Sequence, residues 1–272
     1  MRETSTALDS ASLPSLPYVS HDILLEVNTE ETDINVLAPK LGRDPALAAR
    51  IVSTANSAFF MSQGDVRSLD EAIMRLGMNR LRVLATSILL RNQFDSGRCP
   101  GFRAARYWLH AIASANASGR LARASGLDPA PAQLGGLLHS IGILLLAHSF
   151  PTEMTTVFSA RKRDSHTSMA ALIREQLEVD HHEAGAMLLR EWELPVTLCA
   201  VVEGFGNPSA HDDPGLIGLV RCAADWAGTD FEEIPAALLN RGLSGATLDT
   251  VARACLMEQE ETTAMARLLA AD

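Results

Sequence analysis

The stretch LGGLLHSIGILLLA, residues 134–147, is the longest apolar run in the chain, and its centre holds His139. It is too short to cross a bilayer, which takes about 20 apolar residues, so it predicts one buried helix. Each glycine inside a helix costs roughly 1 kcal/mol relative to alanine. We therefore expect Gly135, Gly136 and Gly142 to be present because neighbouring helices approach closely there.

The composition is typical of an acidic globular protein. The 272 residues are 47% apolar and carry a net charge of −10, enough for one large domain or two small ones. An acidic chain binds phosphate backbones poorly, so no direct nucleic-acid binding is expected. The four cysteines lie far apart without a CxxC pair, which fits a reducing compartment and packing as small apolar residues. The N-terminus lacks the apolar stretch of a signal peptide. These features predict a cytoplasmic protein with no membrane association.

The remaining sequence is typical of helices nearly throughout, because alanine and leucine dominate and strand alternation is scarce. Capping signals at Asp44-Pro45, Ser68 and Asp180 mark helix starts. Pro39 should kink or shorten the helix that contains it. Helices are predicted roughly over residues 19–27, 34–41, 45–56, 69–76, 79–90 and 181–192, with another beginning at Pro195. The predicted fold is all-α.

The domain boundaries follow from polar and breaker-rich segments. Residues 1–12 are polar and predicted to be disordered. Residues 91–102 are rich in Asn, Gly and Pro and form the best linker. The chain thus divides into an N-terminal helical subdomain (13–100), a second helical unit (101–228) and a C-terminal extension (229–272). The extension is predicted to form two helices on either side of Leu243-Ser244-Gly245.

Several separate motifs occur in an order that resembles the HDOD family, the HD-related output domains of bacterial signalling proteins. The motifs are Leu13-Pro14-Ser15-Leu16-Pro17, Arg43-Asp44-Pro45-Ala46-Leu47, Ala55-Asn56-Ser57-Ala58-Phe59, Ser68-Leu69, Leu76-Gly77 and Leu137-Leu138-His139-Ser140-Ile141-Gly142. The resemblance extends over roughly residues 13–227. It implies an N-terminal helical subdomain packed on an HD-like helical bundle, and a role in bacterial signalling rather than metabolism.

The resemblance also implies a metal centre that has lost ligands. In HD phosphohydrolases a His-Asp pair holds a divalent metal that activates the attacking water, whereas this chain has His139-Ser140. A serine hydroxyl is neutral and a poor ligand for a hard cation. Where relatives carry a His-His pair, this chain has Phe205-Gly206. No catalytic residue is therefore assigned.

The other positions of the metal pattern are retained. Residues that match it by resemblance define a candidate ligand pocket, which consists of His110, His139, Ser140, His182 and Asp225. His110, His139 and Asp225 alone could form an open three-ligand site, but the loss of an anionic ligand weakens both metal affinity and water activation. We favour the interpretation that these histidines are buried polar residues, with a weakly bound divalent metal as the alternative and no other cofactor. Ser140 as a nucleophile is disfavoured, because neighbouring helical side chains point about 100° apart.

Three functions are compatible with these residues. The first is a non-catalytic signalling module that binds a regulatory protein or a small ligand. The second is a divergent metal-dependent phosphohydrolase or phosphodiesterase. The third, a nucleotide-binding regulator, rests on analogy alone, since the sequence has no phosphate-binding glycine motif. The sequence does not determine the partner or the oligomeric state.

Overall fold

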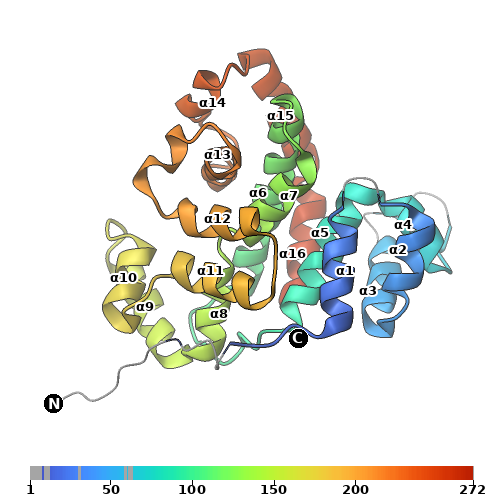
Figure 1. The fold of residues 1–272 in the computed structure, drawn as a ribbon, viewed down its shortest axis with the longest axis horizontal. Helices are drawn as coiled ribbons and strands as arrows, with labels where there is room; N and C mark the ends of the chain where they lie inside the picture. The colour runs from blue at the N-terminus through green and yellow to red at the C-terminus, as the bar shows by residue number, and fades with distance from the viewer. Residues whose placement is uncertain (1–7, 9–12, 30–31, 58–59, 61–63, 272) are drawn as a thin grey trace.

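A computed structural model describes residues 8, 13–29, 32–57, 60 and 64–271. This part of the chain contains helices and no strand (Figure 1), so the all-α prediction is confirmed. The predicted disorder of residues 1–12 concerns positions that, apart from Leu8, lie outside the described residues. The same holds for Ala58 and Phe59 of the Ala55–Phe59 motif.

The N-terminal helices are α1 (Tyr18–Val27), α2 (Ile34–Leu41), α3 (Pro45–Ala55), α4 (Leu69–Leu76) and α5 (Met78–Arg91). Among them, α3 and α4 begin where the capping signals at Asp44 and Ser68 predicted. The Asp44 carboxylate accepts hydrogen bonds from the backbone N–H groups of Ala46 and Leu47, which otherwise lack partners at a helix start. Asn56 joins the end of α3 to the following loop through two hydrogen bonds with the backbone of Val66. The α2 helix contains Pro39 and ends two residues later.

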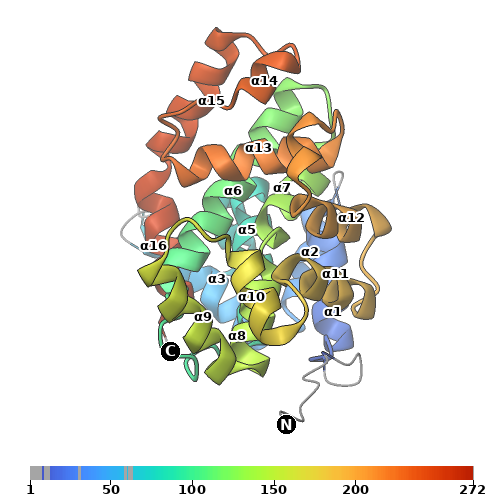
Figure 2. The same cartoon turned by 90° about the vertical axis from the view of Figure 1, so that its left-hand side faces the viewer.

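The second helical unit is built around α6, a helix of 21 residues that packs against α7, α13 and α16. Its elements are α6 (Ala104–Ala124), α7 (Pro129–Leu138), α8 (Ile141–Ser149), α9 (Pro151–Arg163), α10 (Met169–Leu177), α11 (His181–Glu191), α12 (Val196–Phe205), the 3-10 helix η2 (Pro208–Asp212) and α13 (Leu216–Gly228). In Figure 2, α8, α9 and α10 lie at one end of the molecule and α13 and α15 at the other. The α11 and α12 helices connect these ends, because α11 packs on α8 and on α12, and α12 packs on α13.

The prediction of one helix across residues 134–147 is wrong, because the chain turns at His139-Ser140 between α7 and α8. The two helices pack against different neighbours. A Cβ atom on Gly136 would lie 2.6 Å from the Ser118 hydroxyl oxygen of α6, whereas one on Gly142 would meet the His181 carbonyl of α11. The glycines therefore do permit close helix contacts, but in two directions, and the polar pair sits at the corner between them.

The C-terminal extension contains three helices rather than the predicted two: α14 (Ala236–Asn240), α15 (Gly245–Met257) and α16 (Gln259–Ala270). The break at Leu243-Ser244-Gly245 is present, but a second break occurs at Glu258. The Glu258 carboxylate forms an ion pair with Arg120 of α6 at 2.6 Å. A contact so distant in sequence leaves no local signal. The α16 helix then returns between α6 and α5 (Figure 1).

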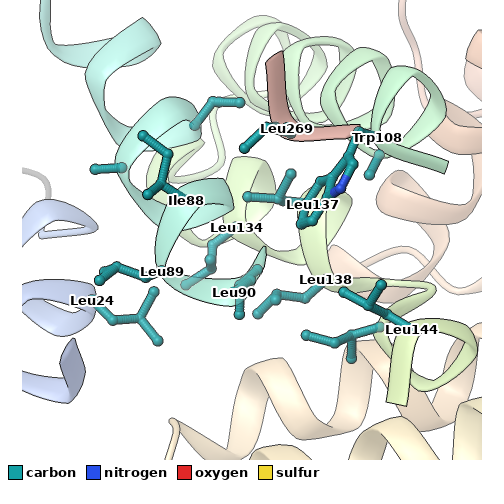
Figure 3. Close-up of a cluster of buried hydrophobic side chains, with 14 of the residues drawn as sticks. Leu24, Ile88, Leu89, Leu90, Trp108, Leu134, Leu137, Leu138, Leu144 and Leu269 are labelled. Atoms are coloured by element: carbon teal, nitrogen blue, oxygen red, sulfur yellow. The ribbon is translucent and has the colours of Figure 1, made fainter. Parts of the chain in front are cut away.

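One hydrophobic core extends across both helical units. Figure 3 shows Leu24 of α1 and Leu89 of α5 in the same cluster as Trp108 of α6, Leu137 of α7 and Leu269 of α16. The segment 129–149 is long and apolar enough to span a membrane by length and composition, but 89% of its most apolar window is buried inside the protein. It forms the centre of this core. The division at residue 100 stays a prediction, and the core is continuous across it.

Candidate functional site

His139 lies at the turn between α7 and α8, with only 3% of its surface exposed. Its Nδ1 atom is 2.7 Å from the carbonyl oxygen of Gly136. A carbonyl only accepts, so Nδ1 carries the proton and Nε2 carries the lone pair. Histidines that bind metals are commonly held this way, with the second nitrogen donating to a backbone carbonyl. The His139 ring is therefore held in the orientation that is common for a metal-binding histidine.

The ring of Phe205, the last residue of α12, packs against two of the predicted site histidines. Its centroid is 4.7 Å from that of His139 and 5.5 Å from that of His182, which sits in the first turn of α11. The His110 ring, from α6, meets His139 edge-on at 5.2 Å. The structure thus brings three predicted histidines together: His139 and His182 each contact the phenyl ring, and His110 contacts His139.

Gly206 makes room for this arrangement. A Cβ atom at position 206 would lie 2.6 Å from Cδ2 of His182, closer than real Cβ contacts come. The backbone at Gly206 has ordinary right-handed helical angles, so the glycine is required for space rather than for its conformational freedom. The sequence Phe205-Gly206 therefore acts as a unit, in which one residue fills the pocket and the other admits the His182 ring.

Arg221 of α13 also packs on the phenyl ring of Phe205. Its guanidinium carbon lies 4.7 Å from the Phe205 centroid, a cation–π contact. The same guanidinium donates one hydrogen bond to the Phe205 carbonyl at 2.7 Å and another to Asp225 Oδ2 at 3.0 Å. One cation therefore holds both the backbone and the ring of Phe205.

Asp225, predicted as a ligand beside His110 and His139, is bound by other groups. Its Oδ2 atom accepts hydrogen bonds from Arg221 and, at 2.5 Å, from His211 Nε2 of η2. The carboxylate remains close enough to His110 to favour the charged form of that imidazole. Its negative charge is nevertheless directed mainly toward the guanidinium.

Ser140, which replaces the aspartate of the doublet, is buried. Its side chain lies near the phenol of Tyr107 on α6 and opposes the rise that burial causes in the pKa of that phenol. The Ser140 side chain makes no capping hydrogen bond at the start of α8. Among the described residues the His139 ring is hydrogen-bonded to the Gly136 carbonyl and not to Ser140, so no nucleophile–base pair forms here.

The histidines of this site are held in the neutral form. Burial lowers the pKa of His139 well below its ordinary value, and the neighbouring His110 lowers it further. Burial also lowers the pKa of His182, against the opposing effect of Asp180. The adjacent His181 is more affected, because burial and the positive charge of His182 bring its pKa to about 3. The Nδ1 atoms of His181 and His182 are buried and have no hydrogen-bond partner among the described residues.

These pKa values predict that the protein loses stability in mild acid. Below a pH of about 6.5 the unfolded chain binds protons on these imidazoles, whereas folded His181 resists protonation down to about 3. The stabilisation is complete above pH 6.5 and is lost as the pH falls from there toward 3. Between pH 7 and pH 5, His181 alone should remove about 2 kcal/mol from the free energy of unfolding.

Urea unfolding at pH 5, 6 and 7 measures this loss. His181→Gln should flatten the pH dependence by about that amount. His166→Gln, at an exposed position, is the matched control and should leave the slope unchanged. An equal slope in wild type and His181→Gln would show that His181 titrates alike in the folded and unfolded states.

The side chains present do not fit a divalent metal. Among the described residues, no group of three or more His, Cys, Asp or Glu side chains is arranged to hold an ion. The phenyl ring of Phe205 packs against both His139 and His182, and the Arg221 guanidinium is paired with the Asp225 carboxylate. A dication there would displace an aromatic ring and sit beside a fixed positive charge, which costs free energy.

Sequence reasoning missed Tyr107, His211 and Arg221. The Arg221–Asp225 pair had a usable signal, because residues four apart on a helix are neighbours. Tyr107 and His211 had none, since their contacts with Ser140 and Asp225 join different elements. Phe205 and Gly206 were identified only as lost ligands, and their packing role emerges from the structure.

Comparison with known proteins places this geometry in context. Residues 13–208 match the family described as HDOD domain, a match that ends before α13 and Asp225. A crystal structure from Shewanella amazonensis SB2B, provisionally described as a phosphohydrolase, is 27% identical, with a TM-score of 0.74 and 98% of each chain covered.

Two further relatives are more distant. A protein from Marinobacter aquaeolei VT8, provisionally described as a signal transduction protein, is 24% identical with a TM-score of 0.79, covering 95% of this chain and 60% of that one. It shows likeness of fold alone. An uncharacterized protein of Treponema pallidum (strain Nichols) is 25% identical over 239 residues, 84% of this chain, and this chain spans 45% of its length.

Proposed function

Because this chain belongs to the HDOD domain family, we propose that it is a non-catalytic signalling module that binds a regulatory protein or a small ligand. One observation carries the proposal. The Phe205 ring packs against both His139 and His182 and is held by Arg221. The scaffold of a metal-dependent hydrolase is retained, and its centre is packed as a small aromatic core.

This packing opposes hydrolysis in three ways. Ser140 offers no negative oxygen to a metal, and Asp225 is already paired with Arg221. The phenyl ring excludes the water that a metal would have to activate. The four neutral imidazoles are stable without a metal, since burial favours their uncharged form. Each retained residue thus has a structural role.

A metal-dependent phosphohydrolase is the second candidate, and one observation favours it. His139 still presents its Nε2 lone pair with Nδ1 donating to Gly136, as in a ligand histidine. The Shewanella amazonensis protein provisionally described as a phosphohydrolase covers 98% of this chain at 27% identity. Phe205 and Arg221 would have to leave the site before a metal could enter it.

Restoring the missing aspartate tests whether one residue separates this protein from an enzyme. We expect Ser140→Asp to produce no metal-dependent turnover of bis(p-nitrophenyl) phosphate with Mg²⁺ or Mn²⁺. Position 140 is buried beside Tyr107, so the new carboxylate should lower the free energy of unfolding by about 1–3 kcal/mol. Hydrolysis rates and urea melts of the variant and of wild type measure both effects.

Ser140→Asn is the matched control, because an asparagine side chain has nearly the same shape as aspartate and carries no charge. It should fold with a smaller loss than Ser140→Asp if desolvation of the carboxylate is the cause. Metal-dependent turnover in Ser140→Asp, absent from Ser140→Asn, would contradict the proposed function. It would show that the histidine cluster still supports catalysis once an anionic ligand is present.

A further inference from the structure

A pocket of about 270 Å³ lies away from the histidine cluster, where three parts of the chain meet. The turn between α4 and α5 forms one wall and the facing sides of α6 and α7 form the second. The break between α15 and α16 forms the third. The lining includes Gly77, Arg80, Arg120, Arg123, Gln133 and Glu258.

Gln133 is a buried polar side chain without a partner. Only 8% of its surface is exposed, and what is exposed lines this pocket. Among the described residues, its carboxamide has no hydrogen bond, although an amide offers both donors and an acceptor. Gly119 lies beside it, where a Cβ atom would be 3.3 Å from Cβ of Gln133. The amide atoms are not themselves fully buried, so they open into the pocket, where a ligand can hydrogen-bond to them.

The start of α5 supplies further donors. Gly77 has a φ angle of 72° and provides no side-chain cap, so the first backbone N–H groups of this helix of 14 residues are not satisfied by a cap. The helix dipole adds a partial positive charge at the same point. The pocket lining therefore includes uncharged donors, namely the first backbone N–H groups of α5 and the Gln133 amide.

The charged residues make the pocket cationic in an otherwise acidic protein. Three arginines and one carboxylate line it. Arg80 and Arg120 are paired with Glu258, and Arg80 also with Glu261 at 2.5 Å. Arg123 is exposed and forms no ion pair within the described part of the chain. One guanidinium is therefore available, with two more fixed nearby.

We propose that this pocket binds a small molecule that carries a phosphate group and is no larger than a mononucleotide. An uncapped helix start next to a free guanidinium matches a phosphate, and the Gln133 amide would bind the remainder of the ligand. The volume lies just below the range of drug-sized sites. The ligand would join the α4–α5 turn, the α6–α7 pair and the α15–α16 break, and so strengthen contacts among three segments.

Titration with inorganic phosphate and with AMP tests the proposal, using the full chain and calorimetry at constant ionic strength. Adenosine serves as the control for the base and ribose. We expect AMP to bind, phosphate to bind more weakly, and adenosine not to bind measurably. Arg123→Gln and Gln133→Ala should each weaken AMP binding at least fivefold, a step typical of losing one charge-assisted or buried hydrogen bond.

Arg163→Gln is the matched control, because it removes the same charge from an exposed position at the end of α9. It should leave binding unchanged. Arg123 is exposed, so its variant should fold, and a melting curve of each variant checks this. The proposal is overturned if neither phosphate nor AMP binds, if adenosine binds as well as AMP, or if Arg123→Gln binds AMP as wild type does. These outcomes do not depend on whether the protein hydrolyses phosphodiesters.

Discussion

Replacing Gly142 by alanine is expected to destabilise the protein by at least about 3 kcal/mol, the upper range for inserting atoms into a packed interior. A Cβ atom at this position would overlap the carbonyl oxygen of His181 and approach the backbone nitrogen of Gly185 to 2.8 Å. Both obstacles are backbone atoms, so no side chain can rotate away. The variant can fold only by separating α8 from α11, which carries His181 and His182.

Gly245→Ala is the matched control, because Gly245 is also in a helix but has open space around its Cβ position. Its stability should stay the same or rise by up to about 1 kcal/mol, since alanine is the better helix former. Urea unfolding of both variants measures the difference. Equal stabilities for the two would show that α8 and α11 are not in the close contact described.

The second large effect is expected for Trp108→Ala, which should lower the free energy of unfolding by about 3–5 kcal/mol. Trp108 is 2% exposed and lies among Leu137 and Leu269 in the core cluster of Figure 3. Since this cluster also contains Leu24 and Leu89, the loss should affect both helical units together. Calorimetry should show one transition, shifted to lower temperature.

Tyr18→Ala removes an aromatic ring that is 79% exposed and provides the matched control, with an expected change within about 0.5 kcal/mol. Two separated transitions in Trp108→Ala would indicate that residues on either side of position 100 unfold independently. The continuous core would then contribute less to stability than its burial implies.

Local signals in the sequence predicted most of the fold. Asp44, Ser68 and Asp180 are N-caps as expected, because capping depends on residues two or three positions away. The errors occurred where distant residues decide. The corner at His139-Ser140 depends on Gly136 meeting α6 and Gly142 meeting α11, and the helix end at Glu258 accompanies its ion pair with Arg120.

The candidate site was predictable in its members but not in its construction. His110, His139 and His182 do gather, as the resemblance implied. Phe205 contacts His139 and His182; the sequence indicated its position but not the orientation of its ring. Asp225 was expected to face the histidines, yet Arg221 and His211 take its carboxylate. Such pairings are decided by three-dimensional packing among α12, η2 and α13, which no local pattern encodes.

The most direct test of the central claim is a calorimetric titration of the wild-type protein with Mn²⁺, followed by a phosphodiester hydrolysis assay on the same sample. If Phe205 and Arg221 fill the space against the histidines, neither binding at millimolar Mn²⁺ nor turnover should be detected. One Mn²⁺ ion bound per chain, together with turnover that disappears in His139→Ala, would contradict the account.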